Sequence, residues 1–241
     1  AGGPPLRLAW SAQSEFSPAW SPDGSQIAFL RQKQGEYHDL MLVSALGGVE
    51  RRLGQVRAPE PRQLYRPPPH LDYSPDGTRL VSVDRPEGEH PFFISSIDLK
   101  TGEKTRLTAP PESSVGDLYP RFSPNGKKLA FVRYLNASIC TVYVQEVGAD
   151  GKLAGHARSI RAGASPYNSA PAWTPDGTHL VFTSGSERTS GLWAVRDAPG
   201  AEPRRLPLTD TGVNMMDIQQ TEHHERLLLS YVVQESRTDI I

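Results

Sequence analysis

The chain has a single cysteine, Cys140, among its 241 residues, which excludes an internal disulfide and any site built from several cysteine ligands. Residues 138–144 around it are largely apolar and β-branched, so we expect a buried, unreactive thiol. No apolar run approaches the roughly 18 residues of a membrane-spanning helix, and no signal-peptide pattern opens the chain. The 26 basic and 27 acidic residues nearly cancel, so the composition gives no basis for binding nucleic acid or an anionic membrane.

Glycine and proline are abundant, with 21 and 22 residues, and many belong to a motif that occurs four times. Each copy has an aromatic residue, then Ser or Thr, Pro, Asp or Asn, and Gly, followed by an alternating apolar run. Proline presets φ for the turn, Asp or Asn bonds its own backbone, and glycine takes the positive φ. Each copy therefore predicts a β-hairpin. The copies span 18–30, 70–83, 119–132 and 171–182.

The spacing of these turns predicts the fold class. The turn residues Asp23, Asp76, Asn125 and Asp176 are 53, 49 and 51 positions apart, by subtraction of their numbers. Periods of about 40–50 residues with several strands each are typical of propeller blades, and no long segment has helical periodicity. We expect an all-β protein, a β-propeller of four-stranded antiparallel blades, as one domain over 1–241. Its five repeats are predicted at about 11–54, 64–108, 115–161, 167–208 and 214–241.

Within each repeat we label the four expected strands A to D. In the first repeat they fall near 17–20, 26–31, 39–45 and 50–54. The last repeat is degenerate and lacks the turn motif, while residues 6–10 resemble a D strand that precedes the first A strand. We therefore expect 6–10 to complete the last blade and close a five-bladed ring, which would leave no open sheet edge. The alternative is that the chain is part of a six- to eight-bladed ring.

The repeated Ser-Pro-Asp-Gly turns, each followed by Leu or Ile and an apolar strand, resemble the repeats of TolB-type β-propellers over almost the whole chain. The last repeats also resemble the C-terminal propeller of bacterial CadC-like winged-helix regulators, through residues 173–177, 190–193, 204–206 and 229–235. That resemblance implies a periplasmic or otherwise extracytoplasmic sensor or interaction module of a larger protein, in one case a membrane-bound transcriptional regulator. The 241 residues contain no winged-helix segment or kinase motif.

Two enzymatic alternatives share this resemblance. Similar propellers cover the hydrolase domain of prolyl-oligopeptidase-type peptidases, but the Gly-x-Ser-x-Gly elbow that such a domain needs is absent here. Oligogalacturonate lyases resemble the propeller too and use histidine-bound metal, yet the seven histidines share no ligand spacing. Each Asp-Gly turn offers a single carboxylate, too few for calcium. We expect a non-catalytic protein without a metal or cofactor.

In a propeller, the D-to-A and B-to-C connections emerge on one side, which we call the loop-rich face. Here these connections are long and polar, so we expect a protein or peptide to bind on this face, and no nucleic acid. Tyr65, Tyr119 and Tyr167 precede A strands at similar offsets and are the first candidates. Further candidates share polar side chains on the same connections: Arg66, Asp117, Asn168, His38, His90 and Arg188. The B-to-C connections also hold Glu36, Tyr37 and Arg85.

Overall fold

The computed structural model describes residues 7–59, 71–86, 88, 91–162, 165, 168–185 and 191–207. These residues form four antiparallel sheets, each built from four strands that follow one another in the chain. The first sheet contains β1 (Glu15–Trp20), β2 (Gln26–Gln32), β3 (Tyr37–Ser44) and β4 (Arg51–Arg57). The second contains β5 (Leu71–Tyr73), β6 (Arg79–Asp84), β7 (Phe93–Asp98) and β8 (Lys104–Arg106).

The third sheet contains β9 (Gly116–Phe122), β10 (Lys128–Asn136), β11 (Ile139–Val147) and β12 (Leu153–Ile160). The fourth contains β13 (Asn168–Trp173), β14 (His179–Ser184), β15 (Gly191–Arg196) and β16 (Arg204–Arg205). The expected all-β class with four-stranded antiparallel sheets is thereby confirmed. None of the described residues belongs to a helix long and apolar enough to cross a membrane.

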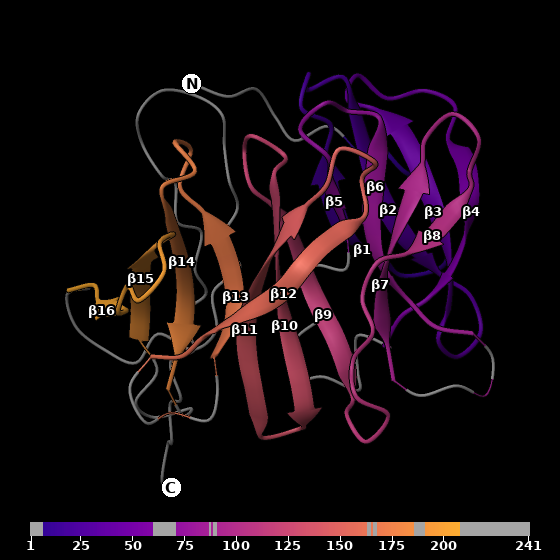
Figure 1. Cartoon of the computed structure of the whole chain (residues 1–241). Helices are drawn as coiled ribbons and strands as arrows, with labels where there is room; N and C mark the ends of the chain where they lie inside the picture. The colour runs from indigo at the N-terminus through magenta and orange to yellow at the C-terminus, as the bar shows by residue number, and fades with distance from the viewer. Residues whose placement is uncertain are drawn as a thin grey trace, which may run out of the picture.

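The four sheets follow one another in space in the order of the chain, from indigo to orange in Figure 1. The first strand of each sheet contacts the first strand of the next, in the series β1, β5, β9 and β13. The first strands are therefore the innermost ones, as in propeller blades arranged around an axis. The largest apolar cluster runs through all four sheets and includes the fully buried Leu40, Leu80, Val132 and Phe182.

Consecutive sheets also touch through their repeated turns. The turn glycines all have a positive φ near 68°, the conformation in which a side chain is strained. A β-carbon built on Gly77 would lie 3.8 Å from Pro22 Cδ, and one built on Gly126 would lie 3.6 Å from Pro75 Cδ. Gly177 stands in the same relation to Pro124. The second, third and fourth turns therefore each lie against the turn proline of the preceding repeat.

The innermost strands carry a bulge at a matching position. The register of β1 against β2 shifts between Phe16 and Ala19. The register of β9 against β10 shifts between Leu118 and Arg121. Ser17 and Tyr119 occupy these bulges with φ of 53° and 57°, the two positive values among the described non-glycine residues. Because the strain recurs in two sheets, we attribute it to the bend of the inner strand.

The lone cysteine lies where the sequence predicts. Cys140 on β11 is fully buried, and its Sγ donates a hydrogen bond to the carbonyl oxygen of Asn168 at 3.3 Å. Burial raises the pKa of this thiol to about 12, which keeps it protonated and weakly nucleophilic.

The predicted closing strand at 6–10 is described only from residue 7. Residues 7–10 form no strand, since Leu8 and Ala9 instead pack against the apolar side chains of Phe29, Met41 and Val43 on the first sheet. The backbone N–H of Trp10 donates to Glu50 at 3.3 Å. The fifth repeat, predicted at about 214–241, lies outside the described residues, so closure of a five-bladed ring stays a prediction.

Candidate functional site

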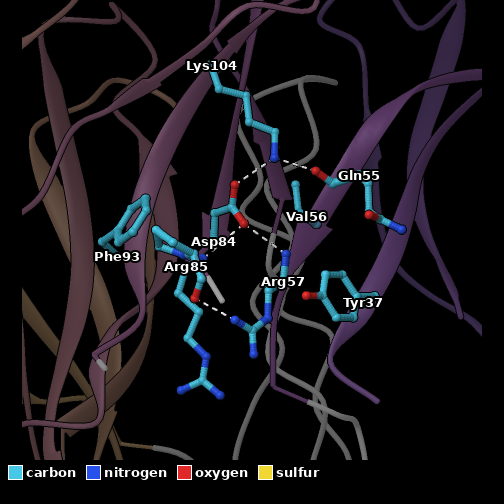
Figure 2. A pocket seen from close by; sticks show the side chains of 9 residues that line it. Tyr37, Gln55, Val56, Arg57, Asp84, Arg85, Phe93 and Lys104 are labelled. Carbon is cyan, nitrogen blue, oxygen red and sulfur yellow. Dashed lines mark hydrogen bonds and ion pairs between the residues drawn. The ribbon is translucent and has the colours of Figure 1, made fainter. Parts of the chain in front are cut away.

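A cavity of about 280 Å³ lies where β4 of the first sheet meets β6 of the second. The cross-strand pairs Tyr37 with Arg57 and Phe93 with Asp84 mark the ends of these sheets from which the B-to-C and D-to-A connections leave. The cavity therefore opens beside the loop-rich face. Its walls consist of charged, aromatic and small apolar side chains, shown in Figure 2: Tyr37, Gln55, Val56, Arg57, Asp84, Arg85, Pro86, Phe93 and Lys104. We call it the inter-sheet cleft.

Asp84 joins the two sheets at the centre of this cleft. Its Oδ1 accepts hydrogen bonds from the backbone N–H of Arg57 at 2.8 Å and from its neighbour Arg85 at 2.9 Å. Its Oδ2 accepts a bond from the Nζ of Lys104 at 2.7 Å, and Lys104 reaches the carbonyl of Gln55 as well (Figure 2). Both carboxylate oxygens are thus occupied by donors of the chain, and charge-assisted bonds of this kind are strong.

Two arginines point along the other side of the cleft. Arg57 pairs with Glu36 at 3.2 Å and donates to the carbonyl of Pro86, while Arg85 pairs with the same Glu36 oxygen. The Arg57 guanidinium lies 5.1 Å from the ring centre of Tyr37, and that of Arg85 lies 4.2 Å from Phe92. Such contacts hold a guanidinium in a fixed orientation.

The cleft is rich in donors and poor in free acceptors. Among the described residues, Arg57 and Arg85 pair with Glu36 and Lys104 pairs with Asp84, while the Nε of Arg57 is buried without a hydrogen-bond acceptor. Within the described part of the chain, the lining contains no serine, cysteine or histidine side chain. Over the described ranges, no three His, Cys, Asp or Glu side chains are placed to hold a metal ion. The buried Nε–H of Arg57 could donate to an acceptor of a bound group.

Four of the sequence-predicted site residues are described, and all four are buried. The Nε2 of His38 lies 3.1 Å from the carbonyl oxygen of Ala58, and its ring packs edge-on against Phe16. Asp117 makes a two-pronged ion pair with Arg133 at 2.7 and 2.8 Å. The hydrogen bond with this carboxylate raises the pKa of the Arg133 guanidinium, while burial raises the pKa of Asp117 above its ordinary value against the opposing effect of Arg133.

The other two buried candidates also make contacts within the fold. Tyr119 stacks on Tyr134 with ring centres 6.4 Å apart. The Oδ1 of Asn168 accepts from the backbone N–H of Ala162 at 3.1 Å, and its Nδ2 donates to the carbonyl of Ser165 at 3.2 Å. These four side chains lie under the loop-rich face and not on its surface, and a binding role for them stays a prediction. The remaining candidates lie outside the described residues: Tyr65, Arg66, His90, Tyr167 and Arg188.

Sequence reasoning missed three charged members of the inter-sheet cleft, Arg57, Asp84 and Lys104. Arg57 begins the first D-to-A connection of the predicted repeats, Asp84 lies just before the Arg85 connection, and Lys104 opens the second D strand, 20 positions after Asp84. The packing of the second sheet against β4 brings them together. Arg85 and Tyr37 were visible as residues of B-to-C connections, but nothing in the repeat pattern indicates that they face the same cavity.

No protein-family model matches the chain. The uncharacterized protein Atu1656 of Agrobacterium fabrum is 29% identical over 189 residues, which cover 75% of this chain and 58% of that protein. The uncharacterized peptidase YuxL of Bacillus subtilis is 31% identical over 174 residues, which cover 71% of this chain and 22% of the peptidase. The chain therefore spans only part of the length of these curated relatives.

Solved structures show the same fold. TolB from Acinetobacter baumannii has a TM-score of 0.61 and 18% identity, covering 83% of this chain and 45% of TolB. The β-propeller domain of the Trilobed protease from Pyrococcus furiosus has a TM-score of 0.55 and 11% identity, covering 80% of this chain and 57% of that domain. An S511A mutant of puromycin hydrolase has a TM-score of 0.58 and 18% identity, covering 83% of this chain and 30% of the hydrolase. The architecture is that of a TolB-like β-propeller.

Proposed function

We propose that this chain is a non-catalytic binding module of a larger bacterial protein and that it holds a protein or peptide on its loop-rich face. The observation that carries the proposal is the inter-sheet cleft, which places Arg57, Arg85 and Tyr37 at the loop-bearing ends of two rigid sheets. Recognition residues commonly stand where loops meet a rigid scaffold. The partial coverage of both curated relatives supports a module within a longer protein.

The second candidate is the propeller of a peptidase. It is favoured by the match to YuxL, which covers 22% of that peptidase, and by the likeness to puromycin hydrolase and prolyl oligopeptidase B, of which the chain covers about a third or less. In this case the catalytic residues would belong to another part of the protein. The propeller would then contact a peptide substrate instead of a regulatory partner.

The finer parts of the proposal rest on the sequence. The resemblance of the last repeats to CadC-like regulators favours an extracytoplasmic sensor that belongs to a membrane-bound transcriptional regulator. The repeat spacing favours a single propeller over 1–241 with five repeats. Neither part is needed for the binding role itself.

The test uses peptides selected from a displayed library on the immobilised 241-residue chain. A photo-crosslinking residue is placed at the exposed Glu112, on the loop-rich face, and, as the matched control, at the exposed Lys100 between strands C and D on the opposite face. We expect selected peptides to crosslink from position 112 and not from position 100. Equal crosslinking from both faces, or failure to select any peptide, would contradict the binding role.

For the peptidase candidate, the measurement is hydrolysis of short peptides by the full-length parent protein. Cleavage that is lost when a serine of the sequence Gly-x-Ser-x-Gly outside this chain is replaced by alanine would favour that candidate. A parent protein without such a segment would exclude this class of peptidase.

A further inference from the structure

The third of the four repeated turns carries a reactive pair of neighbours. Asn125 takes the position that aspartate has in the other three turns, and it is the one asparagine of the sequence that is followed by glycine. Its side chain is exposed. Because Gly126 has no β-carbon, its backbone nitrogen is little hindered from approaching the amide carbon of the preceding side chain. The pair therefore contains both the nucleophile and the electrophile of an intramolecular acyl transfer.

The reaction open to this pair is cyclisation with loss of ammonia. The backbone nitrogen of Gly126 loses its proton and forms a bond to Cγ of Asn125, while the bond from Cγ to Nδ2 breaks and ammonia leaves. Water then opens the five-membered succinimide on either side of its nitrogen. Opening at Cγ leaves aspartate. Opening at the backbone carbonyl carbon leaves isoaspartate, in which the main chain runs through Cγ.

The folded turn restrains both reacting groups. The N–H of Gly126 donates to the carbonyl oxygen of Ser123 at 2.8 Å, so the attacking nitrogen holds its proton in a hydrogen bond. The Oδ1 of Asn125 accepts from the Ser123 hydroxyl at 2.8 Å and from the Lys127 N–H at 3.0 Å. These two donors polarise Cγ, but attack still requires the Gly126 N–H to be released from Ser123. The turn must therefore open before the pair reacts.

Aspartate, the first product, fits the folded turn. In the equivalent positions of the first and fourth turns, hydrogen bonds from Ser21 and Thr174 lower the pKa of Asp23 and Asp176 to about 2. A carboxyl group in this setting is ionised at neutral pH, and an ionised carboxylate resists attack by an amide nitrogen. The aspartate formed at position 125 is therefore stable once the turn has closed again.

Isoaspartate, the second product, does not fit. It adds one methylene group to the main chain directly before Gly126, which has a φ of 68° in a closely spaced turn. A β-carbon built on Gly126 would already lie 3.6 Å from Pro75 Cδ of the preceding repeat. A lengthened turn would have to displace this contact between the second and third sheets.

We propose that Asn125 is a site of spontaneous modification, which reacts when its turn opens, and that the folded chain accommodates the aspartate product but not the isoaspartate product. The reaction needs no bound partner and stands apart from the proposed binding function.

The experiment is peptide mapping of three samples kept in the same mildly alkaline buffer: the folded 241-residue chain, the chain unfolded in urea, and a free peptide of residues 119–132. Trypsin releases residues 122–127, and chromatography with mass spectrometry separates the asparagine, aspartate and isoaspartate forms. A sample taken at time zero corrects for conversion during digestion. Asn136 and Asn168 precede alanine and serine and should stay amides in the same digests.

We expect the peptide and the unfolded chain to convert at similar rates, and the folded chain at least tenfold more slowly, because opening of the turn costs free energy. A folded chain that converts as fast as the peptide would overturn the proposal. So would a peptide and an unfolded chain in which Asn125 stays an amide.

A pair of substitutions tests whether opening of this turn sets the rate. Ser123→Ala leaves the reacting pair unchanged but removes the hydroxyl that bonds Asn125 and accepts from the Lys128 N–H at 2.9 Å. We expect the folded variant to convert roughly fivefold faster. Ser21→Ala removes the equivalent hydroxyl of the first turn and is the matched control, which should convert at the original rate. Equal rates in the two variants would contradict a role for the third turn.

Urea denaturation of the separated products tests how they fit. We expect the aspartate form to unfold at the same urea concentration as the variant Asn125→Asp, and the isoaspartate form to unfold at a lower one. Equal midpoints for the two products would show that the turn accommodates both, and that part of the proposal would be wrong.

Discussion

The Asp72 carboxylate on β5 accepts a hydrogen bond from the backbone N–H of Phe122 on β9, with 2.7 Å between Oδ2 and N. Arg121 donates back to the carbonyl of Leu71 at 3.2 Å, so the innermost strands of the second and third sheets are held in both directions. Burial raises the pKa of Asp72 to about 6, although Arg121 and the Phe122 N–H oppose the shift. Adjacent sheets are thus joined by a carboxyl group that titrates near neutral pH.

This pKa gives a pH dependence of stability with a definite sign. Because the folded-state pKa lies above the ordinary value of 3.8, the folded chain binds the proton more tightly than the unfolded chain. The stabilising contribution of Asp72 is complete below about pH 4 and is lost as the pH rises through about 6. As the pH rises from about 4 to about 8, we expect the free energy of unfolding of Asp72→Asn to increase by about 1–3 kcal/mol relative to that of the original chain.

The measurement is urea denaturation of both proteins across this range. Asp23 and Asp176 titrate at lower pH and in the opposite direction, with pKa values of about 2 because of hydrogen bonds from Ser21 and Thr174. The difference between the two proteins cancels these contributions. A difference that does not change with pH would show that Asp72 has an ordinary pKa.

The third turn has asparagine where the other three have aspartate. The Oδ1 of Asn125 accepts from the Ser123 hydroxyl at 2.8 Å and from the Lys127 N–H at 3.0 Å, as Asp76 does from Ser74 and Thr78 in the second turn. An ionised carboxylate accepts such bonds more strongly than an amide does. We expect Asn125→Asp to raise the melting temperature at neutral pH by roughly 1 °C, and Asp76→Asn to lower it by a similar amount.

Differential scanning calorimetry of the two variants checks this pair of predictions. At about pH 2 the introduced carboxyl should be partly protonated, because the equivalent Asp23 and Asp176 have pKa values of about 2, so the gain from Asn125→Asp should shrink. A gain that persists unchanged in acid would mean that charge on the turn is not its cause.

The aromatic residue before each turn has a different environment in the first sheet. Tyr73, Phe122 and Trp173 are 5%, 9% and 0% exposed, and Phe122 packs against Val81 and Ile94 of the preceding sheet. Trp173 Nε1 donates to the carbonyl of Arg121 on the preceding sheet at 3.2 Å. Trp20 is 56% exposed. We expect Trp173→Ala to lower the free energy of unfolding by about 3–5 kcal/mol and Trp20→Ala by less than about 1 kcal/mol.

Denaturant titration of the two variants makes Trp20 the internal control for Trp173. Equal losses in the free energy of unfolding would contradict the small loss expected for Trp20→Ala. They would mean that another sheet covers Trp20 in solution. In that case the five-bladed or larger ring expected from the repeats would be favoured.

The buried ion pair of Asp117 and Arg133 predicts a strong coupling. Removing one partner leaves the other charge buried without compensation, so we expect Asp117→Asn to destabilise the chain by about 2–4 kcal/mol. The double variant with Arg133→Met should cost less than the sum of the single changes. A double-mutant cycle by urea denaturation measures the coupling, and strict additivity would show that the pair contributes no interaction energy.

Sequence reasoning succeeded where the cause is local. The turns at Asp23, Asp76, Asn125 and Asp176 follow from the residues themselves, because proline and glycine restrict the backbone at fixed positions. The burial of Cys140 followed from its apolar strand. The same reasoning placed Tyr119 and Asp117 on connections, yet both side chains are buried on β9, since the bulge at Tyr119 extends the inner strand toward the loops.

The sequence by itself determined the repeat, the order of the strands and the antiparallel sheets, because hairpins form between neighbouring segments and depend on short-range steric and hydrogen-bonding preferences. Only the tertiary structure decided which sheet faces meet. The cleft unites Tyr37, Arg57, Asp84 and Lys104, and the pKa of Asp72 depends on β9, some fifty positions away. Such contacts arise from packing one sheet against the next, and no periodicity within a single repeat specifies them.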